Sequence, residues 1–377
     1  MHKDKDIEQE HIEKIQSEEE DDYSDDDLYN INSWGADLSF RELLTMYDEE
    51  ELLKPEIQRN YVWEKAEASR FIESLLMGLP VPSIFLAKQG TKKLIVDGYQ
   101  RIMTVRDFVR GVFSKDNSVF TLSSNNKINP RWRGKTFELL SDDDKRKIKS
   151  STIHAIIFEQ KEPKGSDTSL YQIFERINTG GRTLTAQEIR NCVYHRELNK
   201  LIIDLNKRED WRDLYGTPQP DSRMKDVEFI LRFFAINTKE VLESKANQIS
   251  LKRQLNLFMG DKKNNSGPTI NKFEQEFIQT MVFIKQNIGK NAFHNVSFDK
   301  EGNAKIIERF HPTIFDSIAI ATLRAISLGK SSGENLQQKR LQLLKDTHYK
   351  NAISIRTTNV DHIKVRIDLA SQYLFGI

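Results

Sequence analysis

Residues 93–101, KLIVDGYQR, join a short apolar run to a cluster of polar side chains. The apolar run is typical of a buried strand, and apolar residues recur at helical spacing after Arg101, so the strand turns directly into a helix at Asp97-Gly98. Such a turn leaves the first N–H groups of the helix without backbone partners. The sequence therefore predicts an anion site at this corner, although an Asp-Gly pair is also a common turn in proteins without a site.

The side chains of this corner suit phosphate chemistry. Gly98 permits the tight turn, and Arg101 can bind a phosphate through two N–H groups. Asp97 can hold a divalent ion or orient a water molecule. These three residues are the first candidates for a functional site.

Two other polar clusters flank the corner in the sequence. In the first, Gln58 to Trp63 (QRNYVW), Tyr61 could stack on a base, but Trp63 is better explained by packing before the next helix. In the second, Arg176 to Arg182 (RINTGGR), the Gly-Gly pair would let backbone N–H groups approach a phosphate. The spacing alone slightly favours a glycine cap between two helices for this second cluster.

Hydrophobic periodicity predicts a small α+β domain around these clusters, which we place at residues 31–195. Ser39-x-x-Glu42 and Thr185-x-x-Glu188 are capping boxes that open helices, and Gly78, followed by Leu-Pro-Val-Pro, closes one. The predicted helices span about 39–51, 64–77, 99–111 and 170–177, and the predicted strands about 83–87, 92–96 and 153–158.

The net charge of +1 hides a strong segregation along the 377 residues. Residues 1–28 contain thirteen acidic residues and three lysines, so they carry −10 and the remainder carries +11. Because such a tail repels itself and lacks core-forming residues, we expect residues 1–30 to be disordered. A solubilising role is the simpler interpretation; the alternative is that the tail competes with nucleic acid or nucleotide for the basic body.

Several classes of protein and site are excluded or disfavoured by the composition. A single cysteine, Cys192, excludes an intrachain disulfide framework and multi-cysteine zinc sites. No apolar run approaches the roughly 18 residues that cross a bilayer, so we expect a cytoplasmic protein without a membrane partner. We interpret Cys192 as a small core residue, since its helix neighbours are apolar.

Three blocks of the sequence together resemble a known family. They are PEIQRNYVWEKAEASRFIESLLMGLPVPSIFLA, LIVDGYQRIMTV and IFERINTGGRTLTAQEIRNCVYH, which cover about 55–195 in order. This region is similar to the DGQQR-motif domain at the N-terminus of GmrSD-type, modification-dependent restriction enzymes. The resemblance implies a ParB/sulfiredoxin-like fold, and nucleotide binding and hydrolysis linked to DNA restriction and anti-phage defence.

The resemblance also implies a set of site residues. One position departs from the motif, because Tyr99 stands where the family usually has its first glutamine; a phenol can still stack or donate a hydrogen bond there. The positions that match the family are those of the motif, of the upstream Gln-Arg pair and of the Asn-x-Gly-Gly loop: Asp97, Gly98, Gln100, Arg101, Gln58, Arg59, Asn178, Gly180 and Gly181. Independently of the resemblance, Arg176 and Arg182 flank this loop and are further candidates for phosphate binding.

The remaining residues, 196–377, are expected to form a mostly α-helical domain. The histidines in this region show no paired spacing, which disfavours the His-Asn-His nuclease domain that some family members carry. Lys364 and Arg366 are expected on a solvated face, and His311-Pro312 as a turn before a helix. The predicted helices span about 226–236, 251–259, 273–288, 312–328, 336–344 and 360–374.

Two functional classes follow from the site and the resemblance. The first is a Mg²⁺-dependent nucleoside triphosphate phosphohydrolase, in which Asp97 positions Mg²⁺ or water, Arg101 and Arg59 neutralise phosphate charge, and Gln58 and Gln100 orient water or read the nucleotide. The second is a DNA-binding sensor or partner subunit without turnover, which recognises modified DNA. A nuclease that nicks DNA ranks third. Possible partners are a separate nuclease subunit and a second copy of the chain.

Overall fold

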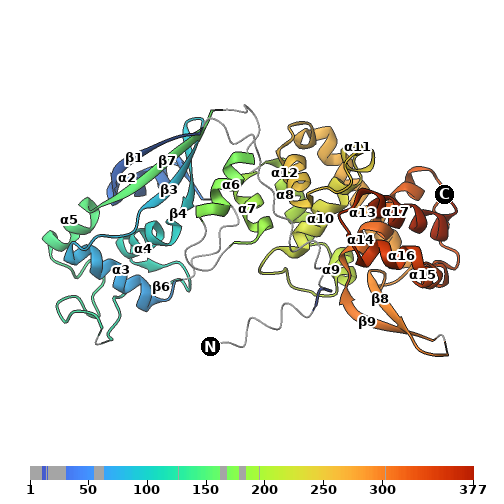
Figure 1. The fold of residues 1–377 in the computed structure, drawn as a ribbon. Helices are drawn as coiled ribbons and strands as arrows, with labels where there is room; N and C mark the ends of the chain where they lie inside the picture. Colours follow the sequence, from blue (N-terminus) through green and yellow to red (C-terminus); the bar gives the residue numbers. More distant parts are fainter. Residues whose placement is uncertain are drawn as a thin grey trace. The chain divides into compact units, whose positions relative to one another are not determined.

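The computed structural model describes most of the chain in two compact units (Figure 1). The sheet unit comprises residues 25–184 and 191–193, and the helical unit comprises residues 1–24, 185–190 and 194–377. The structure describes residues 11–13, 15, 31–54, 63–125, 127–161, 168–177, 184–194, 196–301 and 303–377.

A five-stranded mixed sheet organises the sheet unit, in the order β1-β7-β3-β4-β2. β1 with β7 and β3 with β4 are antiparallel, whereas β3 with β7 and β2 with β4 are parallel. The fold class is therefore α+β with a small mixed sheet, as predicted. The strands are β1 (Ile31–Ser39), β2 (Leu52–Leu53), β3 (Ile84–Gln89), β4 (Lys92–Asp97) and β7 (Thr152–Gln160).

Helices pack on one face of this sheet. Figure 1 shows α3 and α4 on the same side of the strands, where their apolar residues join alternate strand residues such as Leu86, Ile95 and Ile157 in one buried core. The alternation follows from the two-residue period of a strand. The helices of this unit are α2 (Phe40–Asp48), α3 (Lys65–Met77), α4 (Tyr99–Arg110), α5 (Asp142–Ser150) and α6 (Thr168–Ile177).

The predicted helix signals are confirmed at the ends of these helices. Ser39 accepts a hydrogen bond from Glu42 N–H and Glu42 returns one to Ser39 N–H, which is the expected capping box at the start of α2. Gly78 ends α3 in the left-handed conformation. The second capping box, Thr185 with Glu188, opens α7 (Ala186–Val193), in which Cys192 is buried as expected.

Some elements of the sheet unit differ from the sequence prediction. β1 was not predicted, because it is an edge strand with mostly exposed side chains and therefore has no apolar alternation. α5 was also missed, since its sequence DDDKRKIKS is almost entirely charged. A small hairpin of β5 (Val112–Phe113) and β6 (Ser118–Val119) follows α4.

The helical unit confirms the prediction of a mostly helical C-terminal region. One hairpin, β8 (His294–Phe298) with β9 (Ala304–Phe310), interrupts the helices and was not predicted. No described helix is long and apolar enough to span a bilayer. The helices are α8 (Glu197–Asn206), α9 (Glu209–Tyr215), α10 (Lys225–Ile236), α11 (Lys239–Leu242), α12 (Leu251–Gly260), η1 (Lys263–Asn265), α13 (Gly267–Asn287), α14 (Pro312–Ser327), α15 (Leu336–Lys345), α16 (Thr347–Ser354) and α17 (Val360–Phe375).

A buried ion cluster lies among three helices of the helical unit. Asp316 on α14 accepts hydrogen bonds from Arg232 on α10 and from Arg366 on α17, at 2.6 and 3.2 Å. All three side chains are at most 2% exposed. The expectation that Arg366 lies on a solvated face was therefore wrong, because the carboxylate of Asp316 and the carbonyl of Thr357 compensate its burial. His311 precedes α14 as predicted.

A short N-terminal segment packs on the helical unit. Ile12 forms a parallel bridge with Phe310, and the backbone exchanges two 2.9 Å hydrogen bonds, from Glu13 N–H to Phe310 and from Phe310 N–H to His11. Ile12 and Ile15 are buried. This differs from the expectation of a tail without core-forming residues, because these two isoleucines anchor a segment that is otherwise acidic.

Candidate functional site

The corner between β4 and α4 has the geometry that the sequence suggested. Gly98 is the N-cap of α4, with φ of 103°, and no side chain of the described residues caps the helix start. A Cβ atom at this position would lie 2.2 Å from Cγ2 of Ile84 on β3. Glycine is therefore required twice, by the left-handed backbone and by the close approach of β3. The first turn of α4 thus follows the end of β4 after a single residue.

Arg101 and Asp97 form an ion pair at this corner. The Arg101 guanidinium also donates hydrogen bonds to the carbonyls of Pro82 and Ser83, both at 3.0 Å, which fixes it against the segment before β3. The Arg101 side chain is 13% exposed, whereas that of Asp97 is 50% exposed. The corner therefore presents a rigid arginine and an accessible carboxylate side by side.

Gln100 connects the corner to the segment that precedes α3. Its side-chain oxygen accepts a 3.4 Å hydrogen bond from the N–H of Trp63. On the other side of the same segment, the Lys54 ammonium lies 4.8 Å from the centroid of the Tyr99 ring. Residues 55–62 fall outside the described part of the chain, and so do the candidates Gln58 and Arg59. Both residues that flank this segment nevertheless contact the first turn of α4.

Tyr99 differs from the other motif residues because its side chain belongs to the core. It is 7% exposed and packs in the same apolar cluster as Ile102 and Phe108. Burial, together with the neighbouring Tyr47 with which its hydroxyl is hydrogen-bonded, raises the pKa of Tyr99 well above the usual range of a phenol. The described geometry thus offers the backbone N–H of Tyr99, rather than its ring, to the solvent-facing corner.

The second predicted cluster is described only at its first residue. Arg176 lies in the last turn of α6 with an exposed side chain. The other candidates of this cluster, Asn178, Gly180, Gly181 and Arg182, lie outside the described residues. The structure therefore brings together four of the candidates, at the end of β4 and in the first turn of α4: Asp97, Gly98, Gln100 and Arg101.

Comparison with known proteins identifies the region that carries this corner. Residues 40–195 match the family described as GmrSD restriction endonuclease, N-terminal domain. We refer to this region below as the GmrSD-type domain, after the family that it matches. The name of this family is that of a restriction endonuclease, which points to a role in a restriction system and to interaction with DNA. A search of curated proteins gave no match at the level required.

A second polar feature of the GmrSD-type domain lies toward the same end of the strands, near the opposite edge of the sheet. Nδ1 of His154, near the start of β7, is 2.8 Å from a carboxylate oxygen of Asp37, near the end of β1. A Cβ atom at residue 35 would lie 2.6 Å from the His154 ring, so Gly35 leaves the space that the ring occupies. The sequence did not predict this pair, because its residues lie 117 positions apart and Asp37 belongs to β1, a strand that was not predicted.

The donor set at the corner bears on the predicted magnesium site. The described residues contain no group of three or more His, Cys, Asp or Glu that could hold a metal ion. Asp97 offers one accessible carboxylate, which suits Mg²⁺ when phosphate oxygens and water supply the other ligands. The residues of the GmrSD-type domain thus fit a metal ion delivered with a nucleotide better than one held by the protein alone.

Proposed function

We propose that the GmrSD-type domain binds a nucleoside triphosphate at the corner between β4 and α4 and hydrolyses it as part of a DNA restriction system. The observation that carries this proposal is the uncapped start of α4 at Gly98, with Arg101 and Asp97 on the same turn. Backbone N–H groups at a helix start favour phosphate. The accessible carboxylate beside them supplies a group that can hold a phosphate-bound cation or a water molecule.

The chain's own residues have distinct roles in this proposal. The N–H groups of the first turn of α4 and the Arg101 guanidinium neutralise charge that develops on the transferred phosphoryl group. Asp97 orients the attacking water, and its ion pair with Arg101 fixes its position. Mg²⁺, when bound with the nucleotide, supplies further charge neutralisation. Gln58, Arg59 and the residues 178–182 are proposed to complete the site from the segments that follow Lys54 and α6.

The alternative proposal is a DNA-binding sensor that holds a phosphate or a modified base without turnover. The charge of +11 outside the first 28 residues favours this function, because a basic surface attracts the DNA backbone. A nuclease on another polypeptide would then perform the cleavage. Both proposals use the same corner, but they differ in whether a phosphate bond is broken.

A phosphate-release screen separates the two functions. Each of the four common ribonucleoside triphosphates is incubated with the protein and Mg²⁺, with and without DNA. Release of phosphate that Asp97→Ala and Arg101→Ala abolish supports the hydrolase. Binding of DNA that weakens steeply between 50 and 200 mM salt, with no phosphate release under any condition, supports the sensor instead.

A further inference from the structure

Lys54 is a half-buried cation beside the functional corner. Its ammonium lies over the ring of Tyr99, 4.8 Å from the centroid. Among the described residues it forms no ion pair with a carboxylate, although many other lysines of the chain do, for example Lys88 with Glu159 at 3.5 Å. Because a cation removed from water needs compensation, the ring alone leaves part of this cost unmet.

Two observations connect Lys54 with the corner: its place after β2 and its contact with Tyr99. β2 runs parallel to β4 at the edge of the sheet, with Leu53 opposite Leu94. Lys54 directly follows β2, which pairs with the strand that ends in the motif. Tyr99, which the ammonium contacts, is the first residue of α4. Through its contact with the ring of Tyr99, Lys54 is thus linked to the first residue of the helix that begins at the corner.

We propose that Lys54 binds the phosphate groups of the nucleotide at this corner, and that the ring of Tyr99 holds its ammonium in place. The inference rests on the proposed nucleotide site and adds a residue that lies outside the motif. It also gives Tyr99, the position that departs from the DGQQR pattern, a role as a positioning residue: the buried ring presents an aromatic face to the Lys54 ammonium.

Burial supports the same assignment. It lowers the pKa of the Lys54 ammonium from its ordinary value, and no carboxylate of the described residues opposes that shift. A bound phosphate would supply a negative charge that favours the charged form of Lys54. An apolar side chain at this position should accordingly leave the fold intact, because it removes a cation whose burial is only partly compensated.

The test compares four variants by equilibrium binding of fluorescent nucleoside triphosphate and monophosphate analogues, with the thermal midpoint measured in parallel. Lys54→Met should weaken triphosphate binding by about tenfold, weaken monophosphate binding less, and leave the thermal midpoint unchanged or higher. Lys54→Arg should retain most of the affinity. Tyr99→Gln should weaken binding by a smaller factor, because Lys54 keeps its charge but loses the ring.

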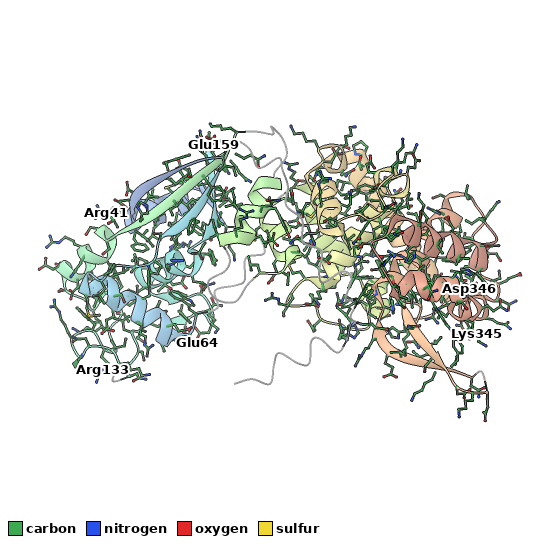
Figure 2. The ribbon with its side chains drawn as sticks, in the orientation of Figure 1. Arg41, Glu64, Arg133, Glu159, Lys345 and Asp346 are labelled. Carbon is green, nitrogen blue, oxygen red and sulfur yellow. The ribbon has the colours of Figure 1, made fainter. Side chains whose placement is uncertain are left out.

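Lys88→Met is the matched control for these variants. Lys88 also lies over an aromatic ring, that of Trp34 at 6.0 Å, but it is near the opposite end of β3 and is paired with Glu159. Figure 2 labels Glu159, the partner of Lys88, near the end of β7. Lys88→Met should therefore leave nucleotide affinity unchanged.

The outcomes separate this inference from the proposed function. If the wild type binds triphosphate and Lys54→Met binds it equally well, the role of Lys54 is wrong while the nucleotide site stands. An equal loss in Lys54→Met and Lys88→Met also overturns it, because the loss then reflects net charge alone. If the wild type binds no nucleotide, both proposals are overturned together.

Discussion

The Arg101 guanidinium forms an ion pair with the Asp97 carboxylate across the turn that joins β4 to α4. The same guanidinium donates to the carbonyls of Pro82 and Ser83. Arg101 therefore links three segments of the corner, and its loss combines a structural effect with a functional one. Asp97 has the higher exposure of the two, so its substitution isolates the functional effect more cleanly.

Substitution of Gly98 by alanine should destabilise the sheet unit. The new Cβ would meet Ile84 and the backbone would stay in the left-handed region, so we expect a loss of about 2–4 kcal/mol in the free energy of unfolding. Urea denaturation measures it. Gly90→Ala is the control, because Gly90 also has a positive φ but no atom lies within 4 Å of its Cβ position; equal losses in both variants would contradict the close approach of Ile84.

Removal of the Asp316 carboxylate should strongly destabilise the helical unit. Asp316→Ala leaves Arg232 and Arg366 buried without their shared anion, which typically costs about 3–5 kcal/mol. Denaturant unfolding, followed by the fluorescence of Trp211, reports the effect. Asp368→Ala, which breaks an exposed pair with Arg324, should change stability by no more than about 1 kcal/mol. Comparable losses in the two variants would contradict a larger contribution of the buried cluster to stability.

The stability of the helical unit should fall as the pH is lowered from about 6.5 to about 4. Burial, reinforced by Arg340 and His11 and opposed by Glu308, lowers the pKa of His294 to about 4. Between the unfolded and folded pKa values the unfolded state binds the extra proton, so stability is present at neutral pH and is lost in this window. Thermal midpoints of the wild type and His294→Leu should diverge there. Parallel pH profiles would contradict the assignment.

Ile12 should anchor the N-terminal segment to β9. Ile12→Asp places a charge in a buried position, and the segment should detach without unfolding the helical unit. Hydrogen exchange at the N–H groups of Phe310 and Glu13, which bond across this contact, should then accelerate. Ile355→Asp is the control, since Ile355 is 55% exposed. Unchanged protection in Ile12→Asp would show that the side chain does not hold the segment.

Local signals in the sequence predicted the parts of the fold that local chemistry determines. The capping boxes at Ser39 and Thr185 and the glycine at 78 mark helix ends because their hydrogen bonds or backbone angles involve neighbouring residues. The turn at Gly98 was predictable for the same reason. β1 and the β8–β9 hairpin were not, because exposed strands lack the apolar alternation that reveals a half-buried strand.

Contacts between distant residues explain the remaining differences. From the sequence Arg366 resembles a surface residue. In the structure it is buried and donates a hydrogen bond to Asp316, fifty positions away. Lys54 has no motif around it, and its relation to Tyr99 depends on the parallel pairing of β2 with β4. Tyr99 itself was expected to face a ligand, whereas its place on the inner side of α4 follows from how that helix packs. Sequence spacing alone carries none of these relationships.

The rate of phosphate release at saturating nucleoside triphosphate and Mg²⁺, measured for the wild type and for Asp97→Asn, tests the central claim most directly. The account predicts release by the wild type and a loss of at least about a hundredfold in Asp97→Asn, with nucleotide affinity and thermal midpoint close to those of the wild type. Equal rates in the two proteins, or no release by the wild type with any of the four nucleotides, would contradict it.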